Sequence, residues 1–127
     1  MKTTPINSPL APAPAGGYSQ ALDVRGAQRL LFISGQIPVD TRSAVPVDFR
    51  AQAELAWANV LAQLQAAELS VQHLVKVTTF LASREHTLAN REVRQQVLGA
   101  HAPALTVMIT GIFDERWLIE IEAIAAA

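Results

Sequence analysis

The sequence predicts an α+β fold in which two helices pack on one face of a mixed β-sheet. Short apolar runs bounded by glycine or polar turns alternate with two longer segments whose apolar residues have helical spacing. The expected order is β-β-α-β-α-β-β. No repeat, internal linker or change in composition divides the 127 residues, so residues 1–127 are expected to form a single domain.

The composition excludes several classes of protein. Half of the residues are hydrophobic and the formal net charge is −1, which gives no basic surface for nucleic acid or an anionic membrane. The chain has no cysteine, which excludes thiol chemistry and disulfides. No signal-like N-terminus and no apolar run long enough for a membrane span is present, so we expect a cytoplasmic protein.

The N-terminal third predicts an arm followed by two strands. Residues 1–16 are rich in proline, alanine and serine, which favours an extended N-terminal arm. Tyr18–Val24 is the first expected strand. Arg29–Ser34 is a dense apolar run, which predicts a second strand buried on both faces.

Two helices and three strands are expected to follow. Asp48 is a plausible N-cap for a helix whose apolar residues recur at three- and four-residue steps until Ala67. After a short turn from Ser70 and a strand over Val75–Leu81, a second helix over Arg84–Leu98 should end at Gly99. Strands are expected over Thr106–Ile112 and Trp117–Ala125.

The last strand has two unlike faces. Alternation places Ile119 and Ile121 on an apolar face, which should lie under the helices. The other face carries Glu120 and Glu122 between Leu118 and Ile124. A mixed face of this kind is typical of a contact between subunits with polar clefts at its edge, so the strand pattern favours an oligomer.

Four blocks of the sequence resemble the Rid family (reactive intermediate deaminases, also called the YjgF family). The blocks, in chain order, are Gly17-Tyr18-Ser19-Gln20-Ala21, Phe32-Ile33-Ser34-Gly35-Gln36-Ile37-Pro38, His101-Ala102-Pro103-Ala104-Leu105-Thr106-Val107 and Leu118-Ile119-Glu120-Ile121-Glu122-Ala123-Ile124-Ala125. The resemblance implies a chorismate-mutase-like fold and a homotrimer with ligand clefts between adjacent subunits.

The resemblance also implies roles for individual residues. Glu120 would be catalytic, orienting or activating water, while Tyr18 would line the cleft. Ser34 and Gly35, together with the backbone amide of Val107, would bind or polarise the substrate. Each residue has an ordinary structural alternative, such as a strand-to-loop turn at Ser34-Gly35, and Glu122 is expected to be structural or solvated.

Leu105 departs from the family pattern. The third block usually reads Pro-Ala-Arg, and that arginine makes a bidentate contact with the substrate carboxylate. Leucine offers neither a donor nor a charge. Hydrolysis of ordinary 2-imino acids by the usual machinery is therefore not expected. A substrate without the usual α-carboxylate, or more apolar at that end, is expected instead.

Another arginine could replace the missing one. Arg91 and Arg84 lie in or beside the second helix, and Arg116 lies in the last turn. The alternative is that the two helix arginines are solvated and pair with Glu85 or Glu92.

No cofactor and no metal are expected. The three histidines, His73, His86 and His101, are isolated in the sequence and have no metal-ligand spacing. No phosphate-binding glycine loop and no serine-nucleophile motif is present.

Two functions remain open from the sequence. The first is a deaminase-like hydrolase of altered specificity, acting on a small imine, enamine or carbonyl metabolite in an inter-subunit cleft. The second is a non-catalytic trimer that binds or senses a small molecule. Endoribonuclease activity, known from the naming of the family, is a poorer candidate because the chain lacks a basic stripe.

Overall fold

The computed structural model describes residues 1–127, and the chain alternates strands and helices as the sequence predicts, with one additional strand. The elements are, in order, β1 (Lys2–Ile6), β2 (Ala21–Arg25), β3 (Leu30–Gln36), α1 (Phe49–Ala66), β4 (Leu74–Leu81), α2 (Thr87–Leu98), β5 (Ala104–Ile109) and β6 (Ile119–Ala126). Short 3₁₀ turns at Val71–His73 and Arg84–His86 precede β4 and α2.

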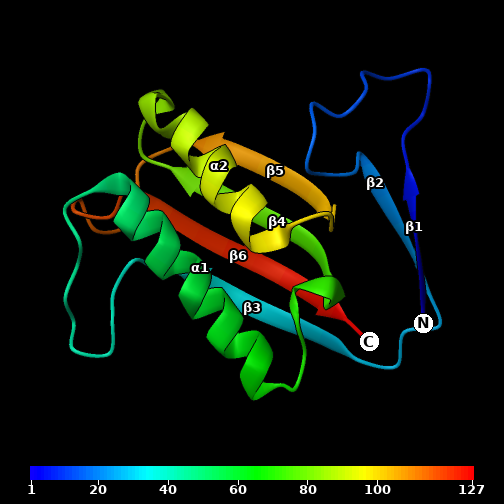
Figure 1. The fold of residues 1–127 in the computed structure, drawn as a ribbon, viewed down its shortest axis with the longest axis horizontal. Coiled ribbons are helices and arrows are strands. Elements are labelled where there is room, and N and C mark those ends of the chain that lie inside the picture. Colours follow the sequence, from blue (N-terminus) through cyan, green and yellow to red (C-terminus); the bar gives the residue numbers. More distant parts are fainter.

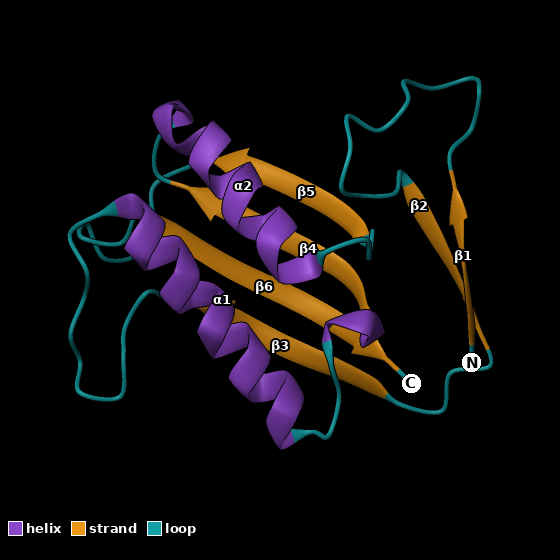
Figure 2. Cartoon of the chain, viewed as in Figure 1, coloured by secondary structure: helices purple, strands orange, loops and turns teal.

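Four strands form one mixed sheet in the order β3-β6-β4-β5. The β4–β5 pair is parallel, whereas β6 is antiparallel to both β3 and β4. Both helices cover the same face of this sheet (Figures 1 and 2). The predicted α+β class and the predicted placement of the helices are confirmed.

The N-terminal region differs from the prediction of an extended arm over residues 1–16. Lys2–Ile6 forms β1, which pairs antiparallel with β2 and places Pro5 opposite Leu22. Proline is tolerated here because β1 is an edge strand and needs no donor on its outer side. The β1–β2 ribbon is a separate two-stranded sheet and stands apart from the four-stranded sheet (Figure 1).

The core lies between the helices and the sheet. Trp57 and Leu64 of α1 are fully buried against Val77 of β4 and against Ile119 and Ile121 of β6. The alternation predicted for the last strand is confirmed, since Ile119 and Ile121 face the helices whereas Glu120 and Glu122 do not. Burying large apolar side chains of this kind stabilises a fold by about 1.5–3 kcal/mol each.

The opposite face of the sheet has no covering element. Phe32 is 70% exposed and Leu30 is 59% exposed, so the prediction that this strand is buried on both faces is wrong for the single chain. Ile33, on the other face of the same strand, is buried under the helices. The dense apolar run therefore supplies one side to the core and leaves the other side open.

Local signals set the helix ends. The Asp48 side chain accepts a hydrogen bond from the backbone N–H of Ala51 at 3.1 Å and begins α1, as expected of an N-cap. Gly99, with φ of 58°, ends α2, because this left-handed conformation favours glycine. Neither helix combines the length and apolar character that crossing a bilayer requires.

Candidate functional site

A cleft of about 290 Å³ lies between α2 and the outer edge of β5. It brings together four of the predicted site residues, Tyr18, Arg91, Leu105 and Val107. Leu105 and Val107 are two positions apart on β5 and therefore point to the same face of the strand, toward α2. The remaining lining residues are Ala15, Gln20, Thr87, Asn90 and Arg94.

Tyr18 is held in the cleft by its neighbour Ser19. The backbone N–H of Ser19 donates to the Pro103 carbonyl at 3.0 Å, and the buried Ser19 hydroxyl donates to the Ala102 carbonyl at 2.6 Å. The Tyr18 hydroxyl accepts a hydrogen bond from the backbone N–H of Ala15 at 3.2 Å. Because the hydroxyl oxygen is the acceptor in that bond, its proton stays free to donate to a ligand.

Leu105 makes its part of the cleft apolar. It pairs in register with Val77 of β4 and packs against the hydrophobic core while lining the cleft. An acid group placed against Leu105 would lose water without gaining a hydrogen-bond partner, which is unfavourable.

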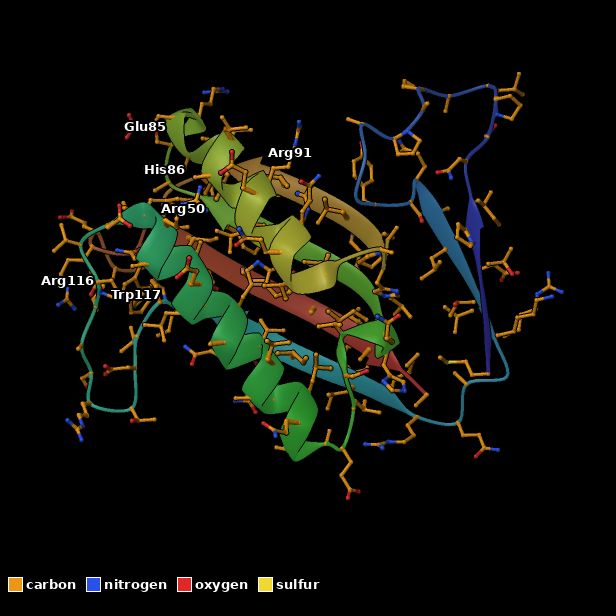
Figure 3. The ribbon with its side chains drawn as sticks, in the orientation of Figure 1. Arg50, Glu85, His86, Arg91, Arg116 and Trp117 are labelled. Carbon is orange, nitrogen blue, oxygen red and sulfur yellow. The ribbon has the colours of Figure 1, made fainter.

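Arg91 is exposed, as the alternative of a solvated helix residue expects, but it forms no ion pair with Glu85 or Glu92. Glu92 instead binds Arg50 of α1, and Glu85 lies 3.7 Å from His86. Figure 3 shows Arg50, Glu85 and His86 near the start of α2 and Arg91 farther along this helix. Glu92 is therefore engaged by Arg50, Glu85 forms no ion pair with Arg91, and Arg91 keeps its charge available to the cleft.

Arg116 and Arg84 do not line the cleft. Arg116 pairs with Asp114 at 3.0 Å in an exposed turn, at a part of the molecule remote from Arg91 (Figure 3). Of the three arginines that the sequence offers as substitutes, only Arg91 reaches the site.

Arg94 is a site residue that the sequence analysis missed. Its residue is only 4% exposed, its side chain lines the cleft, and its Nε has no hydrogen-bond partner. Burial, and then the nearby positive charge of Arg91, lower the pKa of Arg94. The three-residue spacing from Arg91 on one helix face was the available signal, but a charged residue is rarely this buried.

The other predicted residues lie on the open face of the sheet. Gly35 contacts Glu120 so closely that a Cβ on Gly35 would lie 2.0 Å from Glu120 Oε2. Desolvation, and then the charge of Glu122, raise the pKa of Glu120, which is the direction expected for a general acid or base. Ser34 is nearby on β3, and its carbonyl accepts a hydrogen bond from Gln36 Nε2 at 2.9 Å.

The predicted site is thus divided between the two faces of one sheet. Glu120 points to the open face, because its neighbours Ile119 and Ile121 are buried under the helices. The cleft with Tyr18, Arg91 and Leu105 lies on the helix side. A single chain cannot bring these two groups onto one small ligand.

Metal-ligand geometry is not found. No group of three or more His, Cys, Asp or Glu side chains is arranged to hold an ion. The histidines have other contacts: His101 Nε2 lies 2.7 Å from the Leu74 carbonyl, His73 Nδ1 accepts from the Ser70 backbone N–H, and His86 stacks on Phe49.

The fold and the cleft define a class of small α+β proteins with helices on one face of the sheet and a cleft at its parallel edge. A family model described as Endoribonuclease L-PSP matches residues 8–127. The RutC family protein PH0854 of Pyrococcus horikoshii is 37% identical over 117 residues, which cover 91% of this chain and 90% of that protein. The Escherichia coli K12 protein TdcF, classed by its name among the reactive intermediate deaminases, is 33% identical over 124 residues, covering 94% of each chain.

Solved structures show the same likeness. The crystal structure of Escherichia coli TdcF with bound serine has a TM-score of 0.73 at 34% identity, over 98% of each chain. A Rid-family protein from Yersinia pestis, YyfB, has a TM-score of 0.84 over 100% of each chain, and at 23% identity it supports the fold alone. The chain belongs to the Rid family.

Proposed function

We propose that this protein binds a small metabolite in clefts between the subunits of a homotrimer and hydrolyses it as a deaminase-like enzyme of altered specificity. The proposal depends most on one observation, the division of the site residues between two faces of a sheet. The open face, with Phe32 exposed, offers an apolar surface on which a second copy would dock. We also propose that the protein acts in the cytoplasm, as expected from the sequence.

In the assembled cleft, Glu120 of one subunit would face Tyr18, Arg91 and Val107 of its neighbour. For an imine substrate, the Glu120 carboxylate would orient a water molecule toward the imine carbon and accept its proton. That proton would pass to the nitrogen, which gives a carbinolamine. Glu120 would then transfer the proton of the carbinolamine hydroxyl to the nitrogen as the C–N bond breaks, so that ammonia and a carbonyl product leave. A carboxyl with a raised pKa suits this alternation between acid and base.

Leu105 limits the substrate. In relatives, the arginine binds the carboxylate of a 2-imino acid. In this protein the same carboxylate would contact the aliphatic side chain of Leu105 and would lose its water without gaining a partner. We therefore expect no accelerated release of ammonia when 2-aminoacrylate is generated in the presence of the wild-type protein. An acceleration would show that another donor replaces the missing guanidinium for this substrate.

Leu105→Arg tests whether the rest of the site is competent. Restoring the planar fork should give ammonia release from 2-aminoacrylate, and Leu105→Lys, which adds charge without the fork, should give much less. Leu105→Arg combined with Glu120→Gln is the matched control and should be inactive. If Leu105→Arg folds and assembles like the wild type but gains no activity, the hydrolase proposal is wrong.

The second candidate function is ligand binding without turnover. It is favoured because position 105 is leucine where the family usually has arginine. It predicts that no substrate is hydrolysed although small molecules bind in the cleft. Endoribonuclease activity stays a poorer candidate, since a chain of net charge −1 lacks the surface that binds an RNA backbone.

A further inference from the structure

The cleft between α2 and β5 contains two arginines and no carboxylate. Arg91 and Arg94 both line it, and the other polar lining residues, such as Tyr18 and Asn90, are uncharged. Neither arginine forms an ion pair, and Glu92 on the same helix binds Arg50 of α1 instead. Within one subunit, the cleft therefore carries two positive charges that no side chain of that subunit neutralises, and in the proposed assembled cleft the single carboxylate of Glu120 would leave one of them uncompensated.

The position of Arg94 is unfavourable without a partner. Arginine stays protonated in proteins, so Arg94 is a buried cation, 4% exposed, with its Nε left without an acceptor. A buried charge that is not paired destabilises a fold, and such groups are usually retained where they serve a site.

The other polar groups of the cleft also suit an anion. The Tyr18 hydroxyl already accepts a hydrogen bond from Ala15 and can donate its proton. The cleft therefore offers three donor side chains, Arg91, Arg94 and Tyr18, in addition to the apolar Leu105. Arginine and tyrosine donors of this kind form strong hydrogen bonds to oxygen atoms that carry negative charge.

We propose that the cleft binds a small doubly charged anion, with Arg94 and Arg91 of α2 as its anchor and Leu105 against its apolar part. The inference deepens the proposed function by naming the chemical class of the ligand and rests on its small-molecule site. The positive charge of the cleft then lies on α2 and not on β5, where Leu105 stands. A dicarboxylate and a phosphoryl group both supply the required charge.

Calorimetric titration at constant ionic strength and pH 8 tests the charge requirement. The probes are succinate and inorganic phosphate as dianions, acetate as a monoanion and succinamide as a neutral analogue. We expect at least one dianion to bind tenfold or more tightly than acetate, and succinamide not to bind. Tighter binding of succinate or of phosphate then identifies the class. Equal binding of acetate and both dianions, or no binding of any probe, overturns the proposal.

Variants assign the binding to the α2 arginines. Arg94→Lys keeps the charge but loses the fork, and Arg91→Gln removes an exposed charge without disturbing the core. Each should weaken binding of the dianion about tenfold or more, whereas Arg84→Gln, outside the cleft, should bind like the wild type. If Arg94→Lys does not fold, Arg91→Gln alone decides. Unchanged affinity in Arg91→Gln would contradict the proposal.

The test separates this inference from the proposed hydrolase function. Dianion binding without hydrolysis of any imine would leave the inference standing and remove the enzyme. Hydrolysis of an uncharged imine, with no preference for dianions, would do the reverse.

Discussion

The carboxylate of Glu120 lies directly against the backbone of Gly35, which is possible only because glycine has no side chain. A Cβ at Gly35 would come within 2.0 Å of Oε2 and 2.7 Å of Cδ of Glu120. This contact determines the position of the Glu120 carboxylate, which is the proposed acid–base group. The resemblance pointed to both residues, and the structure adds the physical reason for the glycine.

Gly35→Ala should therefore displace the Glu120 side chain while leaving the fold intact. We expect the free energy of unfolding to fall by about 1 kcal/mol, since only the end of one flexible side chain must move. The carboxyl carbon resonance of Glu120 should shift clearly in NMR spectra. Gly111→Ala is the control, because nothing lies within 4 Å of the added Cβ there. An unchanged Glu120 resonance in Gly35→Ala would contradict the contact.

The raised pKa of Glu120 predicts a specific pH dependence. Because the folded-state pKa lies above the unfolded value, this group favours the folded state most at pH values below the unfolded pKa. Its contribution is lost as the pH rises through the raised folded-state value. Glu122→Gln removes the second cause of the shift, so it should lower the pKa of Glu120 in an NMR titration and weaken this pH dependence. A pKa of Glu120 that is unchanged in this variant would show that Glu122 is not a cause.

Arg94 shows what sequence reasoning at the residue scale could not reach. The resemblance drew attention to Leu105 and to arginines that could replace the missing one, and Arg91 does line the cleft. Which arginine is buried and which carboxylate is already engaged depends on the packing of α2 against α1, through contacts such as Arg50–Glu92. A sequence pattern does not contain that information.

Elements with local signals were predictable, and those that depend on distant pairing were not. Asp48 and Gly99 mark helix ends by their own chemistry, and alternation along β6 shows which side is buried. β1 was missed because its only partner is β2, and the prolines of this region indicate an unpaired extended arm. The exposure of Phe32 was missed because an apolar run does not show whether both faces are covered.

The N-cap of α1 can be tested directly. Asp48→Ala removes the acceptor for the Ala51 N–H and should lower the free energy of unfolding by about 1 kcal/mol, as measured by urea denaturation. Asp48→Asn retains an acceptor at this position and should remain close to the wild type. Equal stability of Asp48→Ala and the wild type would mean that the cap does not stabilise α1.

At the scale of the whole molecule, the open face of the sheet and the separate β1–β2 ribbon are the features that a single chain leaves unexplained. The outer edge of β3 has no partner strand, and Phe32 and Leu30 beside it are exposed. Unpaired edges and apolar faces of this kind favour association with another copy. Association would also place Glu120 within reach of a neighbouring cleft, as the proposed function requires.

The most direct test of the shared site uses the absence of cysteine from the chain. Glu120→Cys and Val107→Cys place single thiols on opposite faces of the sheet, so a short thiol crosslinker can join them only between subunits. Denaturing gels of a co-assembled mixture of the two variants should show a covalent heterodimer that neither variant forms alone. If the mixture assembles but yields only monomers on the gel, Glu120 does not face a neighbouring cleft and the proposed shared site is wrong.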